Sequence, residues 1–184
     1  RFFVENERGG YLATRHLIER GHRQIAHIGG PRGVMSAIER ARGWRQALAE
    51  VGIEPPPSWH VFSEYEVEPA RVDAIALFGL SPAPTAVFAG SDAIALGVMY
   101  EARARGIAIP EDLSLVGFDG MPITELLGPP LTSVEQPIDR LGRLGAECLI
   151  AMIDGGPEAS QEPTRLPVAL VSRASVAAPK AAMQ

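Results

Sequence analysis

The stretch that decides the fold is Val87–Gly97, VFAGSDAIALG. It opens as a short apolar run, which is typical of a buried strand, and from Asp92 onward its apolar residues recur at helical spacing. Between the two patterns stand Ser91 and Asp92. A serine and a carboxylate at such a junction fit a helix cap, one edge of a ligand pocket or a catalytic pair, and the rest of the chain has to distinguish these.

The same unit recurs along the chain: a short apolar run is followed by a segment with helical spacing. Alternation of this kind favours βαβ units, so we expect an α/β fold, a Rossmann-like parallel sheet flanked by helices. Glycines that follow three of the helical segments agree with helix ends. The predicted strands are residues 25–29, 60–63, 85–89, 113–117, 131–135 and 166–172. The predicted helices are residues 7–20, 36–51, 69–79, 92–105 and 137–154.

Composition narrows the function classes. The 184 residues are 46% hydrophobic, and 17 basic residues are scattered among 22 acidic ones. Without a basic run, this segment is not expected to hold nucleic acid itself. One cysteine, Cys148, and four scattered histidines predict neither disulfides nor a metal site, and no cofactor motif is present. Cys148 lies on the apolar stripe of the last predicted helix, where we expect a buried, inert thiol. No apolar run approaches the ~20 residues of a membrane span.

Polar residues follow several of the predicted strands. Right-handed crossovers bring the carboxyl ends of parallel strands to one edge, and ligands of open α/β sheets bind at that edge. An arginine, carboxylates, hydroxyls and an aromatic face suit a neutral, polyhydroxylated ligand. The residues that this rule collects are Ser36, Arg40, Tyr65, Ser91, Asp92 and Asp119.

Each of these residues also has a purely structural explanation. Ser91 and Asp92 can both cap a helix, Asp119 can form a turn, and an arginine such as Arg40 is usually solvated. A nucleophilic role for Ser91 is disfavoured, because no G-x-S-x-G motif surrounds it and the C-terminal half has no histidine to act as its base. The segment GGPRG at 29–33 lacks the Lys-Ser/Thr of a phosphate-binding loop.

Six segments resemble, in order, those of the LacI/GalR family of bacterial transcription regulators, and the resemblance extends from Val4 to about Ser175. It implies the second lobe of a type I periplasmic-binding-protein-like core that binds a small-molecule effector, most often a sugar. It further implies a cytoplasmic, non-enzymatic homodimer that binds operator DNA through a helix-turn-helix headpiece. The segments are HLIERGHRQIAHIGGP (16–31), RARGWRQAL (40–48), PTAVFAGSDAIALGVM (84–99), GIAIPEDLSLVGFDG (106–120), PPLTSVEQP (129–137) and LPVALVSRAS (166–175).

The resemblance also implies a division of the chain. Residues 1–5 would be a crossover segment and 6–133 the second lobe. A crossover and helix at 134–165 would belong to a mostly absent first lobe, 166–176 would be a returning strand of the core, and 177–184 a flexible tail. The headpiece would be absent, and the apolar stripe of the last helix would face the absent lobe.

Residue by residue, the resemblance implies effector contacts at seven positions. Two of them depart from the family pattern or lie beside a departure: Ser91 stands where an asparagine is usual, and Gly120 stands after Asp119 where a second aspartate is common. These departures leave the ligand open among sugars, purines and other small metabolites. The alternatives are a sugar-binding protein of a solute uptake system and, behind it, a Rossmann-like enzyme. The seven positions are Ser36, Arg40, Tyr65, Ser91, Asp92, Asp119 and Gln136.

Overall fold

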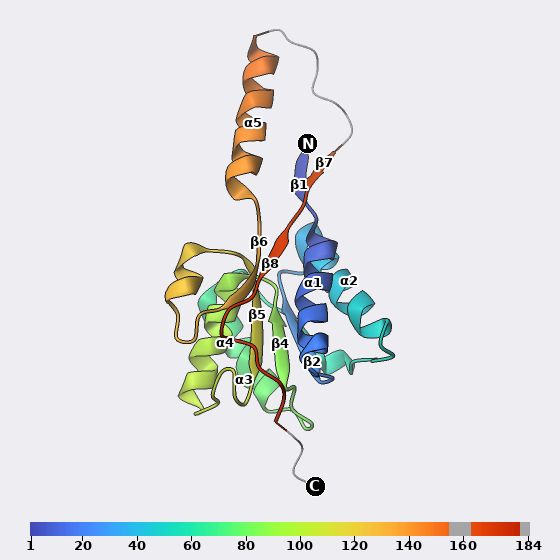
Figure 1. Cartoon of the computed structure of the whole chain (residues 1–184), viewed down its shortest axis with the longest axis vertical. Helices are drawn as coiled ribbons and strands as arrows, with labels where there is room; N and C mark the ends of the chain where they lie inside the picture. Colours follow the sequence, from blue (N-terminus) through green and yellow to red (C-terminus); the bar gives the residue numbers. More distant parts are fainter. Residues whose placement is uncertain (155–162, 181–184) are drawn as a thin grey trace.

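The structure is a computed structural model that describes residues 1–154 and 163–180. Its strands are β1 (Phe2–Val4), β2 (Ile25–Gly29), β3 (His60–Phe62), β4 (Ala86–Ala89), β5 (Ser114–Asp119), β6 (Thr132–Glu135), β7 (Thr164–Leu166) and β8 (Ala169–Val171). Six of them form one sheet in the order β3-β2-β4-β5-β6-β8, which is parallel except for β8. β1 and β7 pair in parallel as a separate two-stranded sheet above it (Figure 1).

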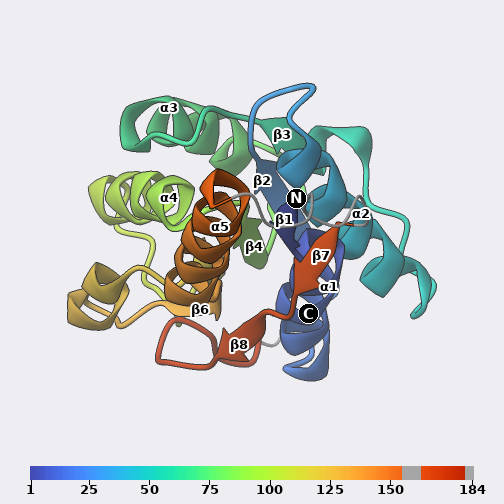
Figure 2. The same ribbon diagram turned by 90° about the horizontal axis from the view of Figure 1, so that it is seen from above.

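Helices cover both faces of the six-stranded sheet. The helices of the described residues are α1 (Asn6–Glu19), α2 (Met35–Ala49), α3 (Val67–Phe78), α4 (Asp92–Ala104) and α5 (Ile138–Ile153), with short 3-10 turns η1 (Pro57–Trp59) and η2 (Pro122–Leu126). The first four of these helices cover the sheet. Viewed from above, α1 and α2 lie over one side of the sheet and α3 and α4 over the other (Figure 2). The α/β architecture expected from the sequence is therefore confirmed.

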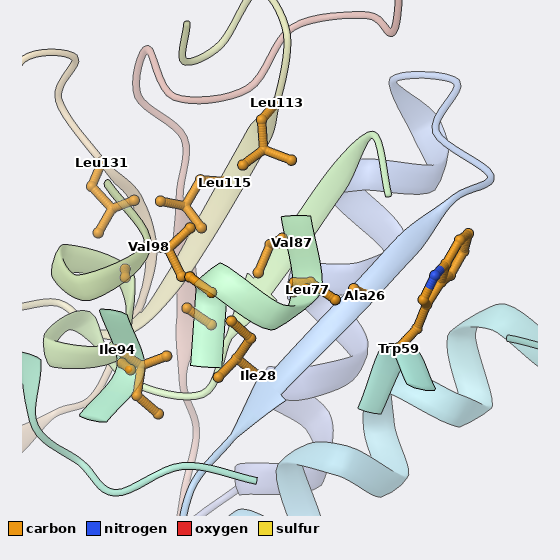
Figure 3. Close-up of a cluster of buried hydrophobic side chains, with 14 residues drawn as sticks. Ala26, Ile28, Trp59, Leu77, Val87, Ile94, Val98, Leu113, Leu115 and Leu131 are labelled. Atoms are coloured by element: carbon orange, nitrogen blue, oxygen red, sulfur yellow. The ribbon is translucent and has the colours of Figure 1, made fainter. Parts of the chain in front are cut away.

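The two faces of the sheet explain the unbroken apolar runs in the sequence. Successive strand residues point to opposite faces, so Ile28 packs towards α3 and α4 while Ile25 packs towards α1 and α2. Figure 3 shows the first of these cores, in which Val87 and Leu115 of the sheet lie near Val98 of α4. A strand buried on both faces needs apolar residues at every position, and each full burial of a Val or Leu contributes about 1.5–3 kcal/mol.

The predicted strand at 166–172 is wrong as a single element. Thr164–Leu166 pairs with β1, and Ala169–Val171 pairs antiparallel to β6, so the two pieces belong to different sheets. Pro167 lies between them. A proline has no backbone N–H and a fixed φ, so it interrupts a ladder and lets the chain change partners.

Helix α5 stands away from the six-stranded sheet (Figure 1). None of its residues is buried, and Leu149, Ile150 and Ile153 are 59%, 58% and 75% exposed. Cys148 is partly exposed, so the expected burial of this thiol is not observed. The reason is that the apolar stripe of α5 has no covering element within the described residues.

The C-terminal segment differs from the expected flexible tail over residues 177–180. The Ala177 N–H donates to Ser114 Oγ (3.0 Å), and Lys180 forms an ion pair with Asp112. These bonds fix the segment to the amino end of β5. Residues 155–162 of the predicted loop and residues 181–184 of the predicted tail lie outside the described residues.

Candidate functional site

The order of the sheet reverses between β2 and β4, because the chain runs from β2 out to β3 and then returns to β4 on the other side. Such a reversal opens a crevice beyond the carboxyl ends of the strands. Here the floor of the crevice is backbone: the Gly90 N–H donates to the Ile28 carbonyl (2.7 Å), and a Cβ on Gly90 would lie 3.2 Å from the Gly29 Cα. Polar side chains therefore reach this crevice from neighbouring elements.

Arg40 enters the crevice from α2 and is only 5% exposed. Its Nη1 donates to the Gly90 carbonyl (2.5 Å), its Nε donates to Asn6 Oδ1 (3.0 Å), and its guanidinium lies 3.6 Å from the centre of the Phe118 ring. Burial lowers the pKa of Arg40, while the nearby Asp119 charge opposes that change. An arginine remains charged at neutral pH, so a fixed cation lies at the crevice.

Asp119, the last residue of β5, supplies the opposite charge. Its Oδ1 lies 3.4 Å from Arg40 Nη1 and accepts a hydrogen bond from Gln136 Nε2 (2.6 Å). Its side chain keeps 29% of its surface exposed. Burial raises the pKa of Asp119, and the Arg40 charge and the Gln136 amide only partly offset this. The cluster thus joins a cation from α2, a carboxylate from β5 and an amide from the segment between β6 and α5.

Tyr65 and Ser36 extend the cluster. Their hydroxyl oxygens are 3.2 Å apart, and the Tyr65 ring centre lies 5.8 Å from the Arg40 guanidinium carbon. Gly30 makes room for this ring, because a Cβ there would lie 2.2 Å from Tyr65 Cζ. Close packing against this ring explains Gly30, whereas a Cβ on Gly29 would lie 3.1 Å from His27 Nε2.

Ser91 and Asp92 begin α4 beneath this cluster. Ser91 is 3% exposed and its Oγ accepts from the Ile94 N–H (3.1 Å), so it caps the helix. Asp92 is 0% exposed, and burial raises its pKa to about 6. Its Oδ2 accepts from the Met121 N–H (2.7 Å) and its Oδ1 from Ser133 Oγ (2.6 Å). The predicted orientation of Asp92 towards a ligand is therefore not observed, because both oxygens are bonded inside the fold.

Sequence reasoning missed a buried network behind Arg40. Asn6 Nδ2 donates to Glu39 Oε2 (3.1 Å) and to the Val4 carbonyl (3.3 Å), and Glu39 Oε1 accepts from Arg165 Nη2 (3.1 Å). Val4 is the last residue of β1 and Arg165 lies in β7, so the network ties the cleft arginine to both strands of the small sheet. The rule that polar residues after a strand belong to the site would have found Asn6, had β1 been recognised as a strand.

The site therefore contains five of the seven predicted residues in one cluster: Ser36, Arg40, Tyr65, Asp119 and Gln136. It offers a charge-balanced pair, an amide, two hydroxyls and an aromatic face, which can orient a ligand by hydrogen bonds. Within residues 1–154 and 163–180 no three His, Cys, Asp or Glu side chains gather as a metal site. None of the helices in these ranges is long and apolar enough to cross a membrane.

Comparison with known proteins agrees with this arrangement. The profile of the periplasmic binding protein-like domain matches residues 14–176. The HTH-type transcriptional repressor PurR of Vibrio atlanticus is 39% identical over 148 residues, which are 80% of this chain and 44% of the relative. The chain thus spans less than half the length of this curated relative.

Solved structures give the same picture. The transcriptional regulator CelR in complex with cellobiose is 36% identical, with a TM-score of 0.87 over 95% of this chain and 53% of that chain. A LacI family transcriptional regulator from Enterococcus faecium with bound ribose is 32% identical, with a TM-score of 0.87 over 97% of this chain and 65% of that chain. These relatives are regulators rather than enzymes. The chain belongs to the periplasmic binding protein-like domain family, and its resemblance to the LacI-type regulators is confirmed.

Proposed function

We propose that this chain supplies most of one lobe of an effector-binding core, and that the whole protein is a LacI-type transcription regulator. Its effector is a neutral, polyhydroxylated small molecule, with sugars as the leading class. The observation that carries this proposal is the cluster of Arg40, Asp119 and Gln136 at the reversal point of the sheet, beside the ring of Tyr65.

The charges of the cluster favour a neutral ligand. Arg40 already faces the Asp119 carboxylate, so an anionic effector would compete with that carboxylate for a single cation and would be repelled by its negative charge. A sugar hydroxyl can accept from a guanidinium and donate to a carboxylate at the same time. The Tyr65 ring can pack against the C–H face of such a ligand. The two complexes with cellobiose and ribose among the structural relatives support the same class.

The regulatory step is a population shift between two arrangements of the lobes. An effector in the crevice would contact Arg40, which is bonded through Asn6 and Glu39 to the strands β1 and β7. An effector shifts such an equilibrium only as far as it binds one arrangement better than the other. Operator DNA would be bound by a headpiece outside this chain, and the exposed apolar face of α5 would pack on the other lobe.

The protein is further proposed to act as a homodimer. Ile123 and Leu126 of η2 and the preceding Met121 are 44%, 81% and 45% exposed, and Tyr100 of α4 is 61% exposed. A shallow groove lined by α4 and Leu127 lies beside them. Sedimentation of the protein at the full length of its relatives should give a dimer, and Leu126→Asp should shift it to the monomer. A wild type that stays monomeric at micromolar concentration would overturn this part of the proposal.

The effector class is tested by thermal shift. The protein at the full length of its relatives is screened against ribose, cellobiose, a sugar phosphate and a purine base. A ligand at 100 times its dissociation constant adds about 2.7 kcal/mol to the free energy of unfolding, which is measured as a rise in Tm. A neutral sugar should give the largest shift. A shift given only by the sugar phosphate or the purine would contradict the proposed class, and turnover of a sugar would favour the enzyme alternative.

A further inference from the structure

Asp119 has an unusual backbone conformation for a residue with a side chain. Its φ is +117°, and Gly120 follows with a φ of +73°. A non-glycine residue in such a region costs about 1–3 kcal/mol, and it persists only where surrounding groups enforce it. Gly120 is further constrained because a Cβ there would lie 2.4 Å from Glu135 Cγ. The turn that carries the cleft carboxylate is thus a strained conformation that needs support.

The support comes from two buried side chains beneath the turn. The Met121 N–H donates to Asp92 Oδ2 (2.7 Å), and the Gly120 N–H donates to Ser133 Oγ (3.3 Å). Ser133 in turn donates to Asp92 Oδ1 (2.6 Å). The two backbone N–H groups that follow Asp119 are therefore both held, one by each member of a hydrogen-bonded pair.

This pair is closed to a ligand. Asp92 and Ser133 are both 0% exposed. Asp92 also sits directly against the β5 backbone, since a Cβ on Gly117 would lie 2.4 Å from Asp92 Oδ1. An effector cannot reach the Asp92 carboxylate in this arrangement. Any influence of Asp92 on the effector must pass through the turn that it holds.

We infer that Asp92 and Ser133 are positioning residues for Asp119: by fixing the Gly120 and Met121 N–H groups, they hold the turn in the strained form that aims the Asp119 carboxylate at Arg40 and Gln136. An extended backbone at Asp119 would send its side chain towards a different face of the strand. The inference rests on the proposed function only for its effect on effector affinity, because the geometry of the turn is independent of any ligand.

The test uses two variants and a matched control. Asp92→Ala removes both of the accepting oxygens that hold the Met121 N–H and the Ser133 hydroxyl. Ser133→Ala removes the bridging hydroxyl. Ser114→Ala is the control, because Ser114 is also 0% exposed and loses hydrogen bonds to His22 and Ala177 at the other end of β5. It should cost comparable stability without touching the turn.

The first readout is the three-bond HN–Hα coupling of Asp119 by NMR, which is small at a φ of +117° and large in an extended strand. Asp92→Ala and Ser133→Ala should both raise it, while Ser114→Ala leaves it unchanged. The second readout is affinity for ribose or cellobiose, whichever stabilises the wild type. It should fall about tenfold in the first two variants, as for one lost hydrogen bond to a charged group.

The outcomes separate the two proposals. If neither sugar binds the wild type, the proposed effector class fails while the coupling still decides the positioning role. An unchanged Asp119 coupling in both folded variants would overturn the inference. An equal change of that coupling in Ser114→Ala would also overturn it, because the change would then follow from a general loss of stability and not from the lost support of the turn.

Discussion

The same sheet carries buried polar groups at both of its ends, and the two ends differ in how completely those groups are bonded. At the amino end, His22 is 1% exposed. Its Nδ1 lies 2.9 Å from Thr85 Oγ1, and its Nε2 lies 2.9 Å from both Ser114 Oγ and the Ala177 carbonyl. At the carboxyl end, Asp119 keeps 29% of its side chain exposed beside Arg40.

This difference in bonding indicates that the amino-end cluster is structural and that the carboxyl-end cluster is the candidate binding site. The amino-end cluster uses its bonds within the fold and fastens the C-terminal segment to the sheet, so it contributes to stability alone. The carboxyl-end cluster holds a buried cation beside a carboxylate that stays partly exposed, and the proposal is that this exposed part bonds the ligand. Changes at the first end should alter unfolding, and changes at the second should alter binding.

The largest expected effect on unfolding is that of His22→Ala. The substitution removes a buried ring that bonds Thr85, Ser114 and the Ala177 carbonyl, which keep only their bonds to the Gln24 carbonyl and to one another, and it should cost about 2–4 kcal/mol. Denaturant unfolding measures the loss. Effector affinity of the folded variant should stay within about twofold of the wild type. A larger change would contradict the claim that the amino-end cluster contributes to stability alone.

Asp119→Asn should have the opposite profile. The amide can still accept a hydrogen bond from Gln136 and removes only the charge that faces the buried Arg40, so unfolding should change by about 1–2 kcal/mol, less than in His22→Ala. Effector affinity should fall by about 1.5–3 kcal/mol, as for a lost hydrogen bond to a charged group. Asp112→Asn, which removes an aspartate paired with Lys180 at the amino end, serves as the control in calorimetric titration and should leave affinity unchanged.

The middle of the sheet should show a pH effect on stability alone. Burial lowers the pKa of His27 from 6.5 to about 3, so below pH 6.5 the unfolded chain takes up a proton that the folded chain does not. Stability from this residue is therefore complete above pH 6.5 and falls by up to ~1.36 kcal/mol per pH unit towards pH 3.

Asp92 opposes this trend between its ordinary pKa of 3.8 and about 6, since its raised pKa makes the folded chain bind the extra proton. The His27 contribution is isolated by subtraction. Unfolding of His27→Phe, whose ring can occupy the same aromatic stack against Phe88, should show a shallower pH dependence than the wild type. Equal slopes for the two proteins would show that His27 titrates normally in the folded state.

Ser91→Ala should give the smallest effect on stability. It removes the cap on Ile94 and should cost about 1 kcal/mol, whereas Ser91→Asn keeps a good cap and should cost only a few tenths. Thermal unfolding measures both. The same two variants ask whether Ser91 shapes effector preference: an altered preference in Ser91→Asn at unchanged stability would place Ser91 in the site as well as in the cap.

Much of this organisation could be predicted from the sequence. Apolar runs and helical spacing are local properties of the sequence, so the strands of the sheet and the helices that flank it could be predicted. The rule of the carboxyl edge found Arg40 and Asp119 because it depends only on strand direction. Gln136 came from the family resemblance instead, since it lies beyond a strand whose pairing the pattern alone does not give.

The remaining features depend on contacts between distant segments. Asp92 looked like a ligand residue because sequence cannot show that the turn after Asp119 folds back onto it. The hydrogen bonds of Asn6 and Glu39 behind Arg40 were not predicted, because β1 has only three residues and a strand that short gives no clear pattern in the sequence. The split at Pro167 depends on two separate strand partners, and the exposure of α5 depends on what covers it. Each of these is a tertiary property.

The central claim is that the carboxyl-end cluster binds the effector, and calorimetric titration of Arg40→Ala against Arg45→Ala tests it most directly. Both arginines lie on α2, but Arg40 is buried at the crevice while Arg45 is exposed beside His60. With the sugar that best stabilises the wild type, Arg40→Ala should lose about 30-fold or more in affinity and Arg45→Ala should lose none. Equal affinities for the two folded variants would contradict the account.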